Sequence, residues 1–469
     1  MMPDTDKICC GDICLLMKTQ NILIDNNELP KTNLMKAFLI YLFATVILYF
    51  YGPIEWKTRN LVLTFGLVFI YIIFLYGGYN YGKNRYIYRT KLRGQSKRYY
   101  QTFKDYYYLI SLITIGLSLF SIQRILRLYG WSSISIIING VFGGSYSDLY
   151  FAEKLALSGS EMYGGNLYSI VGLIFSPLTF IYVPMTLLLY KEFSVSKKIV
   201  GVVGIILWVV QRLSSGTMQG FFVIIVIIFS IFMIRNKRIP NKKQKGSIVR
   251  RRKALLILFF VFVLLVSFNF VMTNRVGHFT NFAQRGENVI TYDGPIYNIV
   301  PETHKNLLVW TDFYICQGYY GMSLATTMDW TPMFGAGSSR WLCLELSSLI
   351  SDSIYEKTYP AKIQSAGIPW SASANWHTAF TWFANDVGFI GVIIVMFLIG
   401  WLFVTAYYDA YRIHSPYAVG LFCLLVQMII FLPCNNIVFA DSRTLLPFIV
   451  YTIGLIMTRN NVRIRLRIK

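Results

Sequence analysis

Long apolar runs separated by short polar or basic stretches occupy most of the chain. The runs are continuous rather than alternating, which indicates helices and argues against a β-barrel. About 20 apolar residues cross the hydrocarbon core of a bilayer as one helix. We therefore expect an all-α polytopic membrane protein with about 10 transmembrane helices, at roughly 34–54, 60–78, 106–126, 166–190, 199–213, 219–234, 254–273, 387–406, 417–433 and 444–457.

Composition strengthens this prediction, and the distribution of charge indicates how the chain is oriented in the membrane. Hydrophobic residues make up 55% of the chain and charged residues 14%, with a mean hydropathy of +0.50, whereas soluble domains carry about 25% charged residues. The net charge of +22 lies mostly in short loops between the apolar runs, such as 83–104 and 235–253. Loops of this kind face the cytosol, so both termini are predicted to be cytosolic. This distribution argues for a lipid bilayer and against nucleic acid as the partner.

The predicted organisation has five regions. They are a cytosolic segment at 1–33, transmembrane helices 1–7 at 34–273, a large extracytoplasmic loop at 274–386, helices 8–10 at 387–457 and a basic cytosolic tail at 458–469. In the large loop the acidic residues slightly outnumber Lys and Arg, which places it on the side opposite the basic loops. Two partly apolar stretches, Leu307–Met328 and Trp341–Ile350, predict re-entrant or interfacial helices and would raise the helix count to about 12.

Motifs for metals and cofactors are missing from the sequence. The seven cysteines form no paired CxxC motifs, and the acidic residues of the large loop form no DxD pair. A GxxxxGK[ST] nucleotide loop does not occur either. We therefore expect no metal and no cofactor. The first apolar run begins only near Leu34, so a cleavable signal peptide is not predicted.

Candidate chemistry gathers where the large loop meets the eighth apolar run. His377 and Asp386 lie there, followed by Gly388 and Gly391. A histidine can take a proton from a sugar hydroxyl near neutral pH. Asp386 could orient the imidazole ring or bind a sugar hydroxyl itself. The alternative is structural, with His377 as an interfacial residue beside Trp376 and Asp386 as the cap of the following helix.

The spacing of these residues, H-x8-[DE]-x-G-x2-G, resembles the signature of bacterial O-antigen ligases and Wzy-type O-antigen polymerases. The segment Gln317–Ala325 is similar to a block of oligosaccharide repeat-unit polymerases, and Arg212–Gly216 resembles their arginine-and-glycine turn. The layout of many spans and one late outer loop is also similar over roughly 100–460. Thr378 replaces the asparagine usual in ligases, and Thr217–Gln219 lack the second arginine of many relatives. These departures favour a polymerase over a ligase.

The resemblance implies a GT-C-like fold in the bacterial inner membrane and glycans on undecaprenyl diphosphate as substrates. It also implies a chain-length regulator as a partner. In that setting His377 would be the base and Asp386 its support. Guanidinium groups stay charged and bind phosphate oxygens in pairs, so they could stabilise a leaving diphosphate without a metal. The candidates on the outer face are Arg275, Arg285, Arg340, Arg212 and Arg443.

Two alternatives for these residues and this activity remain open. Arginines at span ends can simply extend their charge toward the headgroups, which is an equal interpretation of Arg212 and Arg443. A ligase would transfer a finished glycan to another acceptor. A transporter or flippase would place polar residues mid-span around a cavity, whereas the polar residues here are concentrated in one outer loop.

Overall fold

The computed structural model describes residues 34–86, 90–129, 166–213, 219–235, 266, 268, 284–285, 288–291, 294–350 and 353–460. The predicted segment 1–33, nearly all of the predicted span 254–273 and most of the tail lie outside these residues. Every other predicted span coincides with a helix. The bundle helices are α2 (Leu34–Tyr51), α3 (Leu61–Arg85), α5 (Tyr107–Tyr129), α8 (Asn166–Leu189), α9 (Val195–Leu213), α10 (Gln219–Arg235), α17 (Ala379–Ile413), α18 (Pro416–Phe431) and α19 (Ser442–Asn460).

Among the described residues, four helical segments are long and apolar enough to cross a bilayer. They are Leu34–Tyr51, Leu61–Arg85, Ile170–Glu192 and Ala379–Ile413, and a fifth is added if the bent pair Arg98–Asp105 and Tyr107–Gln123 forms one span. The apolar parts of α10 and α18 are shorter, and α9 carries Lys197, Lys198 and Arg212. The protein is therefore an all-α membrane protein, but the expected count of about ten spans is not confirmed.

The long helix α17 is held against α3 by glycines. A Cβ atom at Gly400 would lie 2.0 Å from the Leu75 carbonyl oxygen, and one at Gly78 would lie 1.9 Å from the Phe397 carbonyl oxygen. Small residues allow such close approach of two membrane helices. The resulting packing contacts stabilise the pair, because lipid provides no hydrophobic driving force for helix association. Gly388, at φ 66° and ψ 165°, breaks α17 near its N-terminal end.

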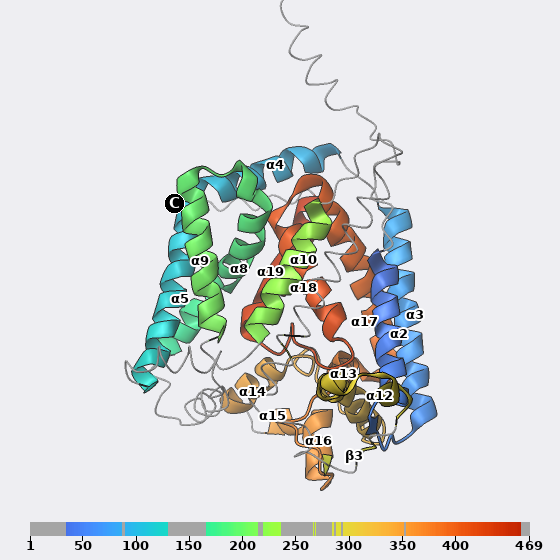
Figure 1. The fold of residues 1–469 in the computed structure, drawn as a ribbon. Helices are drawn as coiled ribbons and strands as arrows, with labels where there is room; N and C mark the ends of the chain where they lie inside the picture. The colour runs from blue at the N-terminus through green and yellow to red at the C-terminus, as the bar shows by residue number, and fades with distance from the viewer. Residues whose placement is uncertain are drawn as a thin grey trace, which may run out of the picture.

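The described residues between 284 and 378 form a layer of helices and a small sheet at one end of the bundle (Figure 1). Both expected apolar helices are present in it, as α13 and α14. Its elements are β2 (Gln284–Arg285), β3 (Asn288–Ile290), α12 (Pro295–Ile299), α13 (Glu302–Ala325), α14 (Arg340–Leu349), α15 (Ser353–Glu356) and α16 (Tyr359–Ser365).

This layer is tied to the turn between α2 and α3. Strand β1 (Ile54–Glu55) in that turn pairs antiparallel with β3, with Ile54 opposite Ile290. The buried carboxylate of Asp312 on α13 accepts hydrogen bonds from the Ile54 backbone N–H (3.1 Å) and the Trp56 indole N–H (3.3 Å). The basic helix α4 (Thr90–Asp105) lies across the opposite end of the bundle (Figure 1). The predicted topology also places the α2–α3 turn and the large loop on one side of the membrane.

Candidate active site

His377 lies in the strand-like segment that leads into α17. That helix begins at Ala379 rather than near 387, and Thr378 caps it by accepting a hydrogen bond from the Thr381 backbone N–H (3.1 Å). The imidazole of His377 is 1% exposed. An early helix start thus buries the histidine beneath the extramembrane layer, where the sequence alone suggested a position at the membrane surface.

The Gln317–Ala325 block of α13 contacts this segment directly. The Trp376 backbone N–H donates to the Gln317 side-chain oxygen (3.1 Å), and the Thr378 backbone N–H donates to the Gly318 carbonyl (3.4 Å). A Cβ atom at Gly321 would lie 2.7 Å from His377 Nδ1 and 2.9 Å from the Trp376 carbonyl oxygen. Two motifs 60 residues apart (317 to 377) therefore form one structure, and the absence of a side chain at Gly321 makes room for the imidazole.

The imidazole is buried and neutral. Neither of its ring nitrogens has a hydrogen-bond partner among the described residues. Burial lowers the pKa of His377 to about 4, because the charged ring would lose its hydration. This value includes two smaller effects: the Gly321 backbone, which meets the ring without a full hydrogen bond, raises the pKa, and the positive charge of Arg340 lowers it. At neutral pH the ring therefore offers one nitrogen as acceptor and one N–H as donor.

Arg340 and Trp370 lie near the histidine in the extramembrane layer, and Tyr355 interacts with Arg340. Arg340 is the first residue of α14, and its guanidinium partly offsets the rise that burial causes in the pKa of Tyr355. The Trp370 indole N–H lies 3.1 Å from the position of a Cβ at Gly321, close to His377. Arg340 Nε and Trp370 Nε1 are both buried and have no hydrogen-bond partner in the described chain.

Unpaired buried donors on neighbouring side chains are uncommon, because each costs about 1–3 kcal/mol of lost hydration. Here they belong to Trp370 and Arg340, next to the equally unpaired imidazole of His377. Together these groups present mostly N–H donors, and they suit a ligand rich in acceptor oxygens, such as a sugar or a phosphate.

Asp386 contacts the loop 335–338 and not the histidine. Its carboxylate accepts hydrogen bonds from the backbone N–H groups of Gly335 (2.8 Å), Gly337 (2.8 Å) and Ser338 (2.7 Å), and from the Ser338 hydroxyl. His377 has no hydrogen bond to Asp386. The expectation that Asp386 orients the imidazole is thus replaced by another arrangement, in which this carboxylate fixes the loop that leads into Arg340.

Replacing Asp386 with asparagine is expected to loosen this loop, because the new amide group would face N–H donors. We expect the local opening free energy to fall by about 1–3 kcal/mol, the cost of leaving such donors unpaired. Hydrogen–deuterium exchange of a peptide that covers 333–340 measures this directly. Asp329→Asn, the same change at an exposed position of the preceding turn, is the control. Unchanged exchange in Asp386→Asn would show that other contacts hold the loop.

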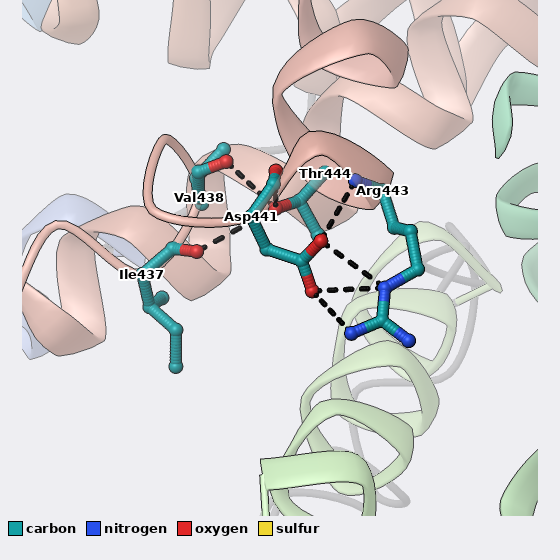
Figure 2. Close-up of polar contacts among 5 residues, drawn as sticks. All are labelled: Ile437, Val438, Asp441, Arg443 and Thr444. Atoms are coloured by element: carbon teal, nitrogen blue, oxygen red, sulfur yellow. Dashed lines mark hydrogen bonds and ion pairs between the residues drawn. The ribbon is translucent and has the colours of Figure 1, made fainter. Parts of the chain in front are cut away.

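A second charged cluster lies in the turn between α18 and α19 (Figure 2). The Asp441 carboxylate accepts hydrogen bonds from the Arg443 guanidinium at 2.8 and 3.1 Å. Burial alone would raise the pKa of Asp441, but the charges of Arg443 and then Arg212 hold it at about 2. The hydroxyl of Thr444 donates to the Val438 carbonyl (2.7 Å) and closes the turn.

This turn adjoins the loop that carries Arg340. Ser339, the cap of α14, donates a hydrogen bond to the Phe439 carbonyl (2.5 Å), and the Asn436 amide donates to the Ser338 carbonyl (2.9 Å). Arg212 lies close by, 8% exposed, with its guanidinium carbon 4.9 Å from the centre of the Trp208 ring. Arg212 is thus buried, whereas the Arg443 side chain is 51% exposed.

The structure thus places six of the seven predicted site residues at one end of the bundle, and the side chains of five of them are described. These are His377, Asp386, Arg340, Arg212 and Arg443. Arg285 lies in β2, opposite Asn288 in the strand register, and its side chain is outside the described part of the chain. Arg275 also lies outside the described residues.

No protein-family model matches this chain. No curated protein and no solved structure matches it either. The functional argument therefore depends on the geometry of the site and on the sequence motifs. Within the described ranges, no three His, Cys, Asp or Glu side chains come together as a metal site.

Three residues of the site were missed in the sequence. Trp370 and Tyr355 lie in a polar stretch without any periodic pattern. Nothing in the sequence therefore indicated that Trp370 lies beside Gly321 and His377, or that Tyr355 interacts with Arg340. Gln317 was part of a recognised block, but it was not singled out as a site residue. Its place just before Gly318 and Gly321 was the available signal of close packing. Its side chain orients the backbone of Trp376.

Proposed function

We propose that this chain is a membrane glycosyltransferase that joins oligosaccharide repeat units carried on undecaprenyl diphosphate into a surface polysaccharide. The observation that carries the proposal is the buried, unpaired imidazole of His377 beside the guanidinium of Arg340, at the end of an apolar helical bundle. A neutral base next to a fixed cation suits the transfer of a sugar from a diphosphate to a hydroxyl.

In the proposed reaction, a hydroxyl of the incoming lipid-linked unit attacks the reducing-end carbon of the growing chain. A new C–O bond forms, and the bond between that carbon and the diphosphate oxygen breaks. The hydroxyl proton passes to His377, which is neutral and can accept it. The lipid diphosphate leaves with the bonding electron pair, and its charge is stabilised by Arg340.

The remaining residues of the site position His377 and Arg340 or add charge near them. Asp386 holds the loop 335–338, so it is a positioning residue for Arg340. Arg443 and Arg212 add positive charge next to the same loop, although Asp441 neutralises part of it. Gln317 and Gly321 set the position of the histidine segment. A polymerase is favoured over a ligase by Thr378, where the ligase pattern has asparagine.

The test uses the purified chain in lipid nanodiscs. Lipid-linked single repeat units, extracted from cells that lack this chain, supply the substrate with its native sugars. We expect a ladder of products with increasing numbers of repeat units. A ligase would instead attach one glycan to an added acceptor lipid, and a transporter would move the unit across a vesicle membrane without forming a glycosidic bond. Either result would overturn the proposal.

A further inference from the structure

Phe334 is an apolar side chain placed at unusual cost in the extramembrane layer. It is 93% exposed, and its φ of 50° lies in the left-handed region. Bulky residues rarely adopt this conformation, because their Cβ atom comes close to the backbone carbonyl. Both the exposure and the backbone conformation would be relieved by a small polar residue or glycine, so the phenylalanine calls for a functional explanation.

The loop that carries Phe334 lies against the N-terminal part of α17. The neighbouring Gly335 backbone N–H donates to Asp386 (2.8 Å), and the Trp330 indole N–H donates to the Asn385 carbonyl (3.1 Å). Carbon atoms of the Trp330 ring lie 3.4–3.5 Å from where a Cβ at Gly388 would be. The loop thus rests on the break in α17, where its apolar run begins.

The same part of α17 exposes a continuous apolar stripe. Beyond the break at Gly388 its members follow each other at a helical spacing of four residues, and they belong to a helix long enough to cross a bilayer. In a membrane protein such a stripe faces the acyl chains. The stripe consists of Val387 (39% exposed), Ile390 (81%), Ile394 (65%) and Leu398 (45%).

Trp330 extends this stripe beyond the helix, and Phe334 is exposed four residues further along the same loop. Trp330 is 47% exposed and packs on Gly388, next to the first stripe residue. On the other side the loop is held by polar contacts, since the Lys362 ammonium donates to the Asp329 carbonyl (2.6 Å) and the Thr331 hydroxyl (2.8 Å). A tryptophan at the edge and a phenylalanine beyond it, with a lysine on the polar side, are typical of a segment in a membrane interface.

We infer that Phe334 and Trp330 form an anchor that inserts into the acyl region of the leaflet on the side of the extramembrane layer. The occupant of this surface is the bilayer itself, because Trp330 packs on Gly388 beside the apolar stripe of α17 and belongs to the same loop as Phe334. This inference goes beyond the proposed glycosyl transfer and does not depend on it. It also means that the Arg340 loop, which Asp386 and Ser339 hold, is fixed at the depth of the lipid headgroups.

A fluorescent depth measurement tests the anchor. Phe334→Cys is labelled with an environment-sensitive thiol probe in nanodiscs, in a chain whose Cys9, Cys10 and Cys14 are replaced by serine; the four described cysteines are buried. Lys357→Cys, at an exposed polar position of the same layer, is the control, and the labelled parent chain gives the background.

For the probe at 334 we expect blue-shifted emission and loss of roughly half of the fluorescence with nitroxide-labelled lipids, since interfacial segments sit about 5–10 Å deep. The probe at 357 should be quenched by aqueous iodide instead. Emission typical of water and iodide quenching at 334 would overturn the inference. The measurement needs no glycan substrate, so its outcome is separate from that of the polymerisation assay.

Discussion

Replacing His377 with alanine is expected to lower the rate of glycan elongation by about 10²- to 10⁴-fold, the usual contribution of a positioned base. The ladder of products should disappear while the amount of folded chain in the nanodiscs stays the same. The change removes a side chain that makes no hydrogen bond within the described structure, so loss of activity would not reflect a broken polar network. Rates are measured as the disappearance of the single repeat unit.

His304→Ala is the matched control for this variant. His304 is also in the extramembrane layer, but it is exposed, and its Nδ1 atom is hydrogen-bonded to the adjacent Thr303 hydroxyl (2.8 Å). We expect a normal ladder from it. A normal ladder from His377→Ala would remove the histidine from the proposed mechanism.

The pH dependence of the rate gives a second measure of the same residue. Proton transfer requires neutral His377, and its pKa is lowered to about 4. The rate should therefore be constant through neutral pH and fall as the pH drops through about 4. With an unperturbed histidine as the base, the rate would already fall at a pH of about 6.5. Arg340→Gln removes a charge that lowers this pKa, so the acid limb should move to higher pH even though substrate binding also weakens.

Gly321→Ala is expected to have the second largest effect, because one added methyl group meets atoms that cannot easily move. Its Cβ would lie 2.7 Å from His377 Nδ1 and 2.9 Å from the Trp376 carbonyl oxygen. Overpacking of this kind costs about 1–3 kcal/mol of stability. Displacement of a catalytic group by about 1 Å can lower a rate by about 10²-fold. Thermal unfolding and the elongation rate measure the two effects on the same preparation.

The control for the added methyl group is Gly77→Ala. Gly77 lies within α3, and a Cβ there would have no atom within 4 Å. Since alanine is favoured over glycine in a helix by about 1 kcal/mol, this variant should be equally or more stable and fully active. If Gly321→Ala behaved in the same way, the histidine segment would be more adaptable than its packing indicates.

The sequence predicted the bundle well because a bilayer imposes a simple rule. An apolar run of sufficient length becomes a helix in lipid, where no water can satisfy its backbone. The expected runs at 34–54, 60–78 and 417–433 therefore correspond to α2, α3 and α18. The rule does not decide whether a shorter helix such as α18 crosses the membrane alone, since its neighbours can bury its ends.

The site could be predicted only in part. His377, Arg340 and the Gln317–Ala325 block were recognisable from residue type and spacing. The partner of Asp386 was not, because a carboxylate nine residues after a histidine can face in any direction once a helix begins between them. Backbone N–H groups of a loop some 50 residues earlier bind it instead.

By itself, then, the sequence determined that this protein lies in a lipid bilayer, which helices it forms and which residue types are available for chemistry. These properties follow from hydrophobicity and charge along the chain. Only the tertiary structure decided that Gly321 lies against His377, and that the buried nitrogen atoms of Trp370 and Arg340 without partners belong to the surroundings of that histidine. It also decided that Trp330 packs on Gly388 and that Phe334 in the same loop is exposed. Such contacts join segments distant in the chain, and they depend on packing and burial, which no local pattern of residues encodes.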